Sequence, residues 1–143
     1  MDTPVSSSLR ITFLIHSLVA LVLGAAVFLI PGRTLTMLNW VPSEVQIRVG
    51  MILPGTKLVD PVTTRILGAA LLALAYSSFQ GWRAIRHEQV RLLVQLEFIF
   101  CVLGAIAVLA GLVTLQRPMP LIGWALAAIL VVFAVLWGLA LRR

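Results

Sequence analysis

Residues 92–115 have the sequence LLVQLEFIFCVLGAIAVLAGLVTL, an apolar run whose only charged residue is Glu97. A helix needs about 20 mostly apolar residues to cross the hydrocarbon core of a bilayer, and this run is long enough. Three more runs of this kind cover residues 9–30, 62–82 and 118–141. An isolated strand cannot cross lipid because its backbone N–H and C=O groups would stay unpaired. The sequence therefore predicts an all-α, polytopic membrane protein with four transmembrane helices in a single membrane domain, residues 1–143.

The composition agrees with this prediction. Hydrophobic residues make up 61% of the 143 residues, charged residues 11%, and the mean hydropathy is +1.08. A soluble domain of this composition would expose too much apolar surface to water. The basic residues stand singly or in pairs beside apolar runs, which is typical of membrane flanks and not of a nucleic-acid-binding face. We expect a lipid bilayer around the chain and no nucleic acid as partner.

The connections between the runs differ in length. Residues 83–91 join the second and third runs, and a turn at residues 116–118 joins the third and fourth. Short connections produce antiparallel neighbours, so these three helices should pack in sequence order within one antiparallel bundle. Residues 31–61 form a long link with two apolar pieces, for which we expect a structured cap that contains a short helix near the membrane interface.

The arginines and lysines indicate the orientation of the chain. One side of the membrane would hold six of them, Arg10, Arg83, Arg86, Arg91, Arg142 and Arg143. The other side would hold five, Arg33, Arg48, Lys57, Arg65 and Arg117. The first group is denser, with three arginines in one short loop and two at the C-terminus. The positive-inside rule then predicts a multi-pass protein of the plasma membrane with both termini in the cytoplasm.

Three polar residues occur at the same depth in the predicted bundle. His16, Tyr76 and Glu97 each lie six positions inside a run from the same membrane face, which is roughly 9 Å at the rise of a helix. An ionisable residue inside a membrane is expensive and suggests a functional site. We therefore predict an intramembrane polar cluster of Glu97, His16 and Tyr76. The neighbouring polar residues at this depth are Ser17, Ser77 and Gln80.

Small residues at helical spacing predict where the helices pack together. Such residues let helix backbones approach closely in lipid, and several share a helix face with the polar residues. The helix-packing residues predicted in this way are Gly24, Ala69, Ala73, Gly104, Gly111, Gly123 and Ala127.

The predicted cluster permits three interpretations. It can hold the helices in register, form a proton-linked or ligand-binding site, or place Glu97 close enough to the interface to pair with Arg91 or Gln95. The two histidines of the chain, of which only His16 lies inside a run, and one buried carboxylate fall short of a zinc or di-iron ligand set. No complete catalytic constellation is present, so the sequence predicts no metal and no cofactor.

The layout is similar to that of the DoxX-like group of small four-helix membrane proteins. The resemblance depends on the four spans, the long first link and the sequence Arg65-Ile66-Leu67-Gly68-Ala69-Ala70 at the start of the second run. It implies a four-helix membrane fold. Many members of such groups have no assigned activity, and some are membrane subunits associated with quinone-linked oxidoreductases. No catalytic residue carries over to this chain.

Two function classes follow from these observations. The first is a small non-catalytic membrane protein that serves as an accessory or assembly subunit of a membrane complex. The second is a small proton-linked transporter or small-molecule-binding protein that uses Glu97. The small multidrug resistance transporters have four spans and work as dimers, although their membrane glutamate lies in the first span and Glu97 lies in the third. The partners expected are a second copy of the chain or a larger membrane complex.

Overall fold

The computed structural model describes residues 4–37, 61–114 and 121–142. These residues form five helices, which are α1 (Ser7–Leu29), α2 (Pro31–Met37), α4 (Pro61–Arg83), α5 (His87–Thr114) and α6 (Leu121–Leu141). Within these ranges the extended pairing consists of a single bridge between Pro4 and Arg86. Helices α1, α4, α5 and α6 are long and apolar enough to cross a membrane. The all-α prediction with four spans is confirmed, and we describe the chain as a multi-pass membrane protein.

Side chains near the first link set the ends of α1 and α2. Ser6 is the N-cap of α1, and its hydroxyl oxygen accepts a hydrogen bond from the backbone N–H of Leu9. The Thr34 hydroxyl of α2 lies 2.8 Å from the carbonyl oxygen of Ala26 and 2.9 Å from that of Ile30. Both carbonyls already accept a backbone N–H, from Ile30 and Thr34 respectively, and the Thr34 hydroxyl adds a side-chain contact to them. Helix α2 therefore folds back on α1, and the rest of the predicted cap, residues 38–60, lies outside the described residues.

Helix α5 begins several residues before the apolar run that predicted it. The Gln89 side-chain oxygen accepts hydrogen bonds of 3.3 Å from the backbone N–H groups of Ile85 and Arg86, just before the helix starts at His87. The apolar run indicates which residues cross the hydrocarbon core, whereas the capping side chain sets where the helix begins. The start of α4 at Pro61 agrees with the preference of proline for the first helical position.

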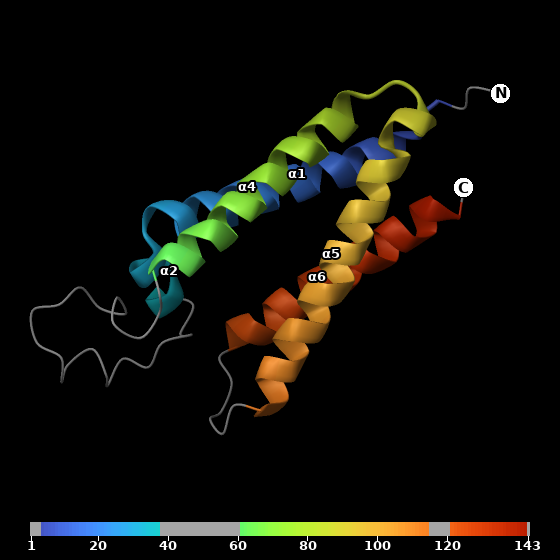
Figure 1. Ribbon diagram of the computed structural model, residues 1–143. Helices are drawn as coiled ribbons and strands as arrows, with labels where there is room; N and C mark the ends of the chain where they lie inside the picture. Colours follow the sequence, from blue (N-terminus) through green and yellow to red (C-terminus); the bar gives the residue numbers. More distant parts are fainter. Residues whose placement is uncertain (1–3, 38–60, 115–120, 143) are drawn as a thin grey trace, which may run out of the picture.

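The four long helices form two antiparallel pairs. Helices α1 and α4 lie side by side along their length, and α5 packs against α6 (Figure 1). Contact between α4 and α5 is limited, although only residues 84–86 join them. The predicted sequential packing is extensive for α5 with α6, whereas α4 contacts α5 over a limited stretch and packs mainly against α1. A short link makes two helices antiparallel, but it does not make their faces complementary.

Glycines explain why α4 packs against α1. A Cβ atom added to Gly68 would lie 2.6 Å from the backbone nitrogen of Phe28, and one added to Gly81 would lie 2.5 Å from the ring of Phe13. A Cβ atom on Gly24 of α1 would lie 2.9 Å from the backbone nitrogen of Leu72. At Gly24 and Gly68 the neighbouring atoms belong to the backbone, so the two helices approach too closely there for a larger residue, whereas at Gly81 the neighbour is the Phe13 side chain.

The predicted helix-packing residues have different positions in the structure. Gly24 lies at a close contact, Gly123 and Ala127 are buried, and Gly104 is half-buried against Leu130. Ala69 and Ala73 are exposed, and a Cβ atom on Gly111 would meet no atom of the described residues within 4 Å. The prediction for Ala69 and Ala73 is corrected because the neighbouring Gly68 faces α1. One residue corresponds to a rotation of about 100° around a helix, which moves Ala69 and Ala73 to the outer side.

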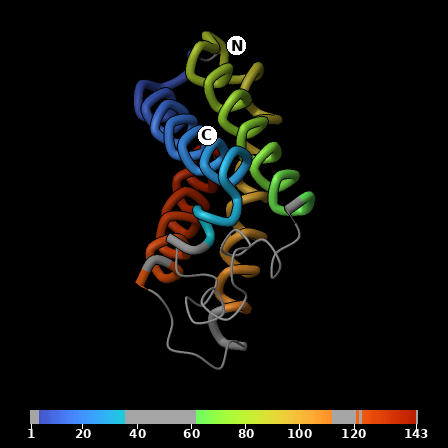
Figure 2. Tube along the Cα trace, turned by 90° about the vertical axis from the view of Figure 1, so that its left-hand side faces the viewer, coloured from blue at the N-terminus to red at the C-terminus, as the bar shows by residue number. Residues whose placement is uncertain are grey.

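The buried core lies at one end of the molecule. It consists of Val5, Leu9 and Phe13 from the N-terminal part, Val90, Val94 and Cys101 from α5, and Phe133, Trp137 and Ala140 from α6. The N-terminal segment, the link between α4 and α5 and the C-terminus all lie at this end (Figures 1 and 2). The backbone N–H of Val5 donates to the carbonyl oxygen of Ile85 and ties the N-terminal segment to that link. The two helix pairs therefore meet mainly at this end.

Candidate functional site

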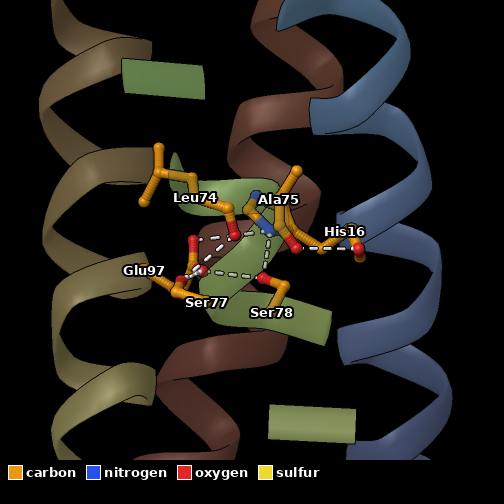
Figure 3. Close-up of polar contacts among 7 residues, drawn as sticks. His16, Leu74, Ala75, Ser77, Ser78 and Glu97 are labelled. Atoms are coloured by element: carbon orange, nitrogen blue, oxygen red, sulfur yellow. Dashed lines mark hydrogen bonds and ion pairs between the residues drawn. The ribbon is translucent and has the colours of Figure 1, made fainter. Parts of the chain in front are cut away.

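Glu97 is the centre of a buried polar cluster between the helix pairs (Figure 3). Its side chain, on α5, has an exposed fraction of 0%. The hydroxyls of Ser77 and Ser78, both on α4, donate to its Oε1 atom at 2.8 Å and 2.7 Å. Hydrogen bonds to a charged acceptor are stronger than neutral ones, particularly where water is excluded. The two serines therefore connect α4 to α5 where the contact between these helices is otherwise limited.

His16 extends the cluster to α1. Its Nδ1 atom lies 2.9 Å from Ser78 Oγ and 3.4 Å from Glu97 Oε2. Ser78 has one hydroxyl proton, and while Glu97 is ionised that proton is donated to the carboxylate. Ser78 Oγ must then accept the N–H of His16 Nδ1. A directed chain of hydrogen bonds thus runs from α1 through α4 to α5.

Aromatic side chains of α6 enclose the histidine. The His16 ring lies edge-on to Phe133 and to Trp137, with centroid distances of 4.7 Å and 5.7 Å. Phe13 of α1 contacts Trp137 at 4.8 Å, and neither of these two rings is exposed. All four long helices therefore contribute to the site, three through polar groups and α6 through an apolar wall that excludes water.

Two further hydroxyl contacts involve backbone carbonyls of α4. Ser17 donates to the carbonyl oxygen of Ala75 at 2.8 Å and adds a second polar link between α1 and α4. The Ser77 hydroxyl lies 3.1 Å from the carbonyl oxygen of Leu74, in addition to its contact with Glu97. Since Ser77 has a single proton to donate, it has two alternative acceptors.

The structure brings together Glu97 and His16 from the predicted cluster, but it does not place Tyr76 with them. Tyr76 is 65% exposed, and its hydroxyl oxygen accepts a hydrogen bond of 2.9 Å from Gln80 Nε2. Among the predicted neighbours, Ser17 and Ser77 lie at the cluster and Gln80 lies with Tyr76. Tyr76 and Ser78 are two positions apart, or about 200° around the helix, so their side chains point to nearly opposite sides of α4. When Ser78 faces the cluster, Tyr76 must face away from it.

Ser78 is the residue of the cluster that our sequence analysis missed. It is fully buried and connects His16 to Glu97. It shares a helix face with Gly68, Ala75 and Gly81, small residues spaced by three or seven positions. This face, and not the one with Ala69 and Ala73, contained the signal for packing against α1.

The described residues offer limited means to hold a metal ion or a large ligand near Glu97. Among them no three His, Cys, Asp or Glu side chains lie close enough to form a metal site. A cavity of about 310 Å³ lies at the end of the molecule with the termini, and Glu97 and His16 do not line it. The lining residues of this cavity are Pro4, Ser6, Ser8, Leu9, Thr12, His87, Leu136, Leu139 and Ala140.

Comparison of the chain with protein-family models, with curated proteins and with solved structures finds no match. The chemistry of the buried cluster is therefore the basis for a functional proposal. Its groups can hold three helices together, and its carboxylate and imidazole can bind or release a proton.

Proposed function

We propose that this protein is a non-catalytic accessory or assembly subunit of a membrane complex, and that the buried polar cluster (His16, Ser77, Ser78 and Glu97) holds its helices in register. One observation carries the proposal. Glu97 is fully buried, and one of its oxygens accepts hydrogen bonds from two serines of another helix. The polar groups of the cluster are thus directed at one another, as expected for a structural contact.

The resemblance to the DoxX-like group and the orientation of the chain belong to the same proposal. The four spans and the long first link support the resemblance. The density of arginines in and beside the α4–α5 link supports a cytoplasmic position for both termini in the plasma membrane. The arrangement of both terminal segments at the same end as this link agrees with that orientation.

The test is purification of the wild-type chain in a gentle detergent from the cells that produce it, followed by size analysis and mass spectrometry. We expect a complex with at least one different membrane protein. Glu97→Leu should reduce recovery of that complex, because the helices lose their register. Gln95→Leu, which changes an exposed residue of the same helix, is the control and should leave recovery unchanged. Purification of this chain without any other protein would contradict an accessory role.

A second function is supported by the alternative hydrogen bonds of the cluster. Ser77 can donate to Leu74 or to Glu97, and Glu97 Oε2 lies near His16 without a hydrogen-bond donor among the described residues. Such a network can rearrange when the carboxylate takes up a proton, as a proton-linked transporter or binding protein requires. Binding of a lipophilic cation that competes with protons in vesicles, and that Glu97→Gln abolishes, would favour this function over the first.

A further inference from the structure

A second polar contact lies on the outer face of α4. Tyr76 and Gln80 are both exposed and point away from α1, and Gln80 Nε2 lies 2.9 Å from the Tyr76 hydroxyl. Tyr76 is seven residues from Arg83 at the helix end, or about 10 Å inside the span. The hydrocarbon core offers no hydrogen-bonding groups, so polar atoms exposed there are costly. A protein partner that supplies hydrogen bonds would therefore stabilise this pair, whereas the apolar residues around it are already compatible with lipid.

The donor and acceptor groups that the Tyr76–Gln80 contact does not use match those of an identical pair. When the Gln80 amide donates to the tyrosine oxygen, the Tyr76 O–H and the Gln80 carbonyl oxygen have no partner among the described residues. If the amide has the opposite orientation, the tyrosine donates to the carbonyl, and the amide N–H groups and the tyrosine oxygen are left. Both arrangements leave at least one donor and one acceptor on adjacent turns. An identical pair related by a two-fold axis supplies the missing acceptor and donor.

We propose that this face of α4 binds a second copy of the chain in parallel orientation. Tyr76 and Gln80 lie near one end of α4, so only a parallel copy brings the two pairs to the same depth. A two-fold axis then lets Tyr76 of each copy hydrogen-bond Gln80 of the other.

The rest of the face leaves room for this contact. Ala69 and Ala73 are exposed on the same line of the helix as the polar pair, and their small side chains allow a second helix to approach. The charged residues Arg65 and Arg83 lie close to the two ends of α4 and not in its middle, where Ala73 and Tyr76 lie. Arg83 also contacts the ring of Phe79, with 5.8 Å between the guanidinium and the ring centroid. The proposal depends on this face alone and not on the proposed function.

The contact is tested by disulfide cross-linking in membranes. Ala73→Cys should form a dimer on mild oxidation, because the two α4 helices approach at this position. Ala107→Cys, on the exposed side of α5, is the matched control and should give only the background of the wild type, whose Cys101 is buried. Equal cross-linking at both positions, or a product with a different protein in place of the dimer, would overturn the proposal.

The polar pair is tested by the dissociation of the dimer in lipid vesicles, followed by energy transfer between labelled copies. Tyr76→Phe and Gln80→Leu each remove both reciprocal hydrogen bonds. One such bond contributes a factor of about 2.8 in lipid, so the loss of two bonds in either variant should weaken the dimer about eightfold. Gln95→Leu, an exposed glutamine on α5, should have no effect. Tyr76→Phe changes one atom and keeps the test valid if Gln80→Leu does not fold. Unchanged dissociation in Tyr76→Phe would refute the pairing.

Discussion

Glu97 has no contact with solvent, so its hydrogen bonds determine what its burial costs. An isolated carboxylate in an apolar medium would be severely unfavourable, and the hydrogen bonds from the two serines compensate for that cost. The same contacts make removal of the carboxylate costly, since the two serines of α4 would lose an acceptor and Ser78 is also the partner of His16 on α1. The contribution of Glu97 to the free energy of unfolding therefore depends on α1, α4 and α5 together.

Substitutions of Glu97 distinguish the effect of its side-chain size on stability from the effect of its hydrogen bonds. Glu97→Gln keeps the size and an accepting oxygen, so we expect it to unfold at nearly the wild-type temperature. Glu97→Leu leaves buried partners unsatisfied and should lower the free energy of unfolding by about 1–3 kcal/mol. Thermal unfolding in detergent at about pH 5 to 8 measures the difference. Equal stability of all three proteins would show that the cluster does not hold the helices together.

The sequence predicts the depth of a polar residue better than its direction. Counting from the charged ends of the spans placed His16 and Glu97 in one layer, and the structure has them 3.4 Å apart. The same count selected Tyr76 and left out Ser78, since both lie at nearly the same depth on α4. Which of them faces inward depends on the rotation of α4 about its axis. That rotation is set by the glycine contacts with α1, which are not visible in the depth of a residue.

Helix α4 provides a test of this glycine packing. Gly68→Ala would bring a Cβ atom against the backbone of Phe28, and no side-chain rotation can relieve a backbone contact. We expect a loss of about 1–3 kcal/mol in the free energy of unfolding. Gly111→Ala on α5 is the control, because its Cβ atom meets nothing within 4 Å in the part of the chain that the structure describes. This control should be neutral or gain up to about 1 kcal/mol from helix propensity.

The two glycine variants together test the arrangement in pairs. If α4 packed against α5 and not against α1, Gly68→Ala would be tolerated as well as Gly111→Ala. Equal unfolding temperatures for the two variants would therefore contradict the α1–α4 pair. The number of helices was predictable because each span needs only a long apolar run. Their pairing was not, because it depends on three glycines whose partners are distant in the sequence.

In the whole molecule, the core and the polar cluster lie toward the end that holds the termini. Arg10 of α1 reaches across this end, and its guanidinium donates to the carbonyl oxygen of Ala84 in the α4–α5 link at 3.2 Å. This contact adds to the backbone bridge between Pro4 and Arg86. The N-terminal segment and the link are thus joined, so they must lie on the same side of the membrane. The sequence predicted this common side because two spans, α1 and α4, lie between the N-terminal segment and this link.

Site-directed labelling tests the orientation of that end. In the wild-type background, where Cys101 is buried, cysteines at Arg86 and Arg142 should react with an impermeant reagent only from the cytoplasmic side. A cysteine at Lys57, in the link between α2 and α4 and outside the described residues, should react only from the opposite side. The physical reason is the density of arginines around the α4–α5 link, which resist transfer across the membrane. The basic residues are divided six to five between the two sides, which favours one orientation only slightly. The alternative is insertion in both directions, in which case every site would label from both sides. That result would contradict the single orientation and would also remove half of the parallel contacts expected for α4, so the labelling and cross-linking experiments constrain each other.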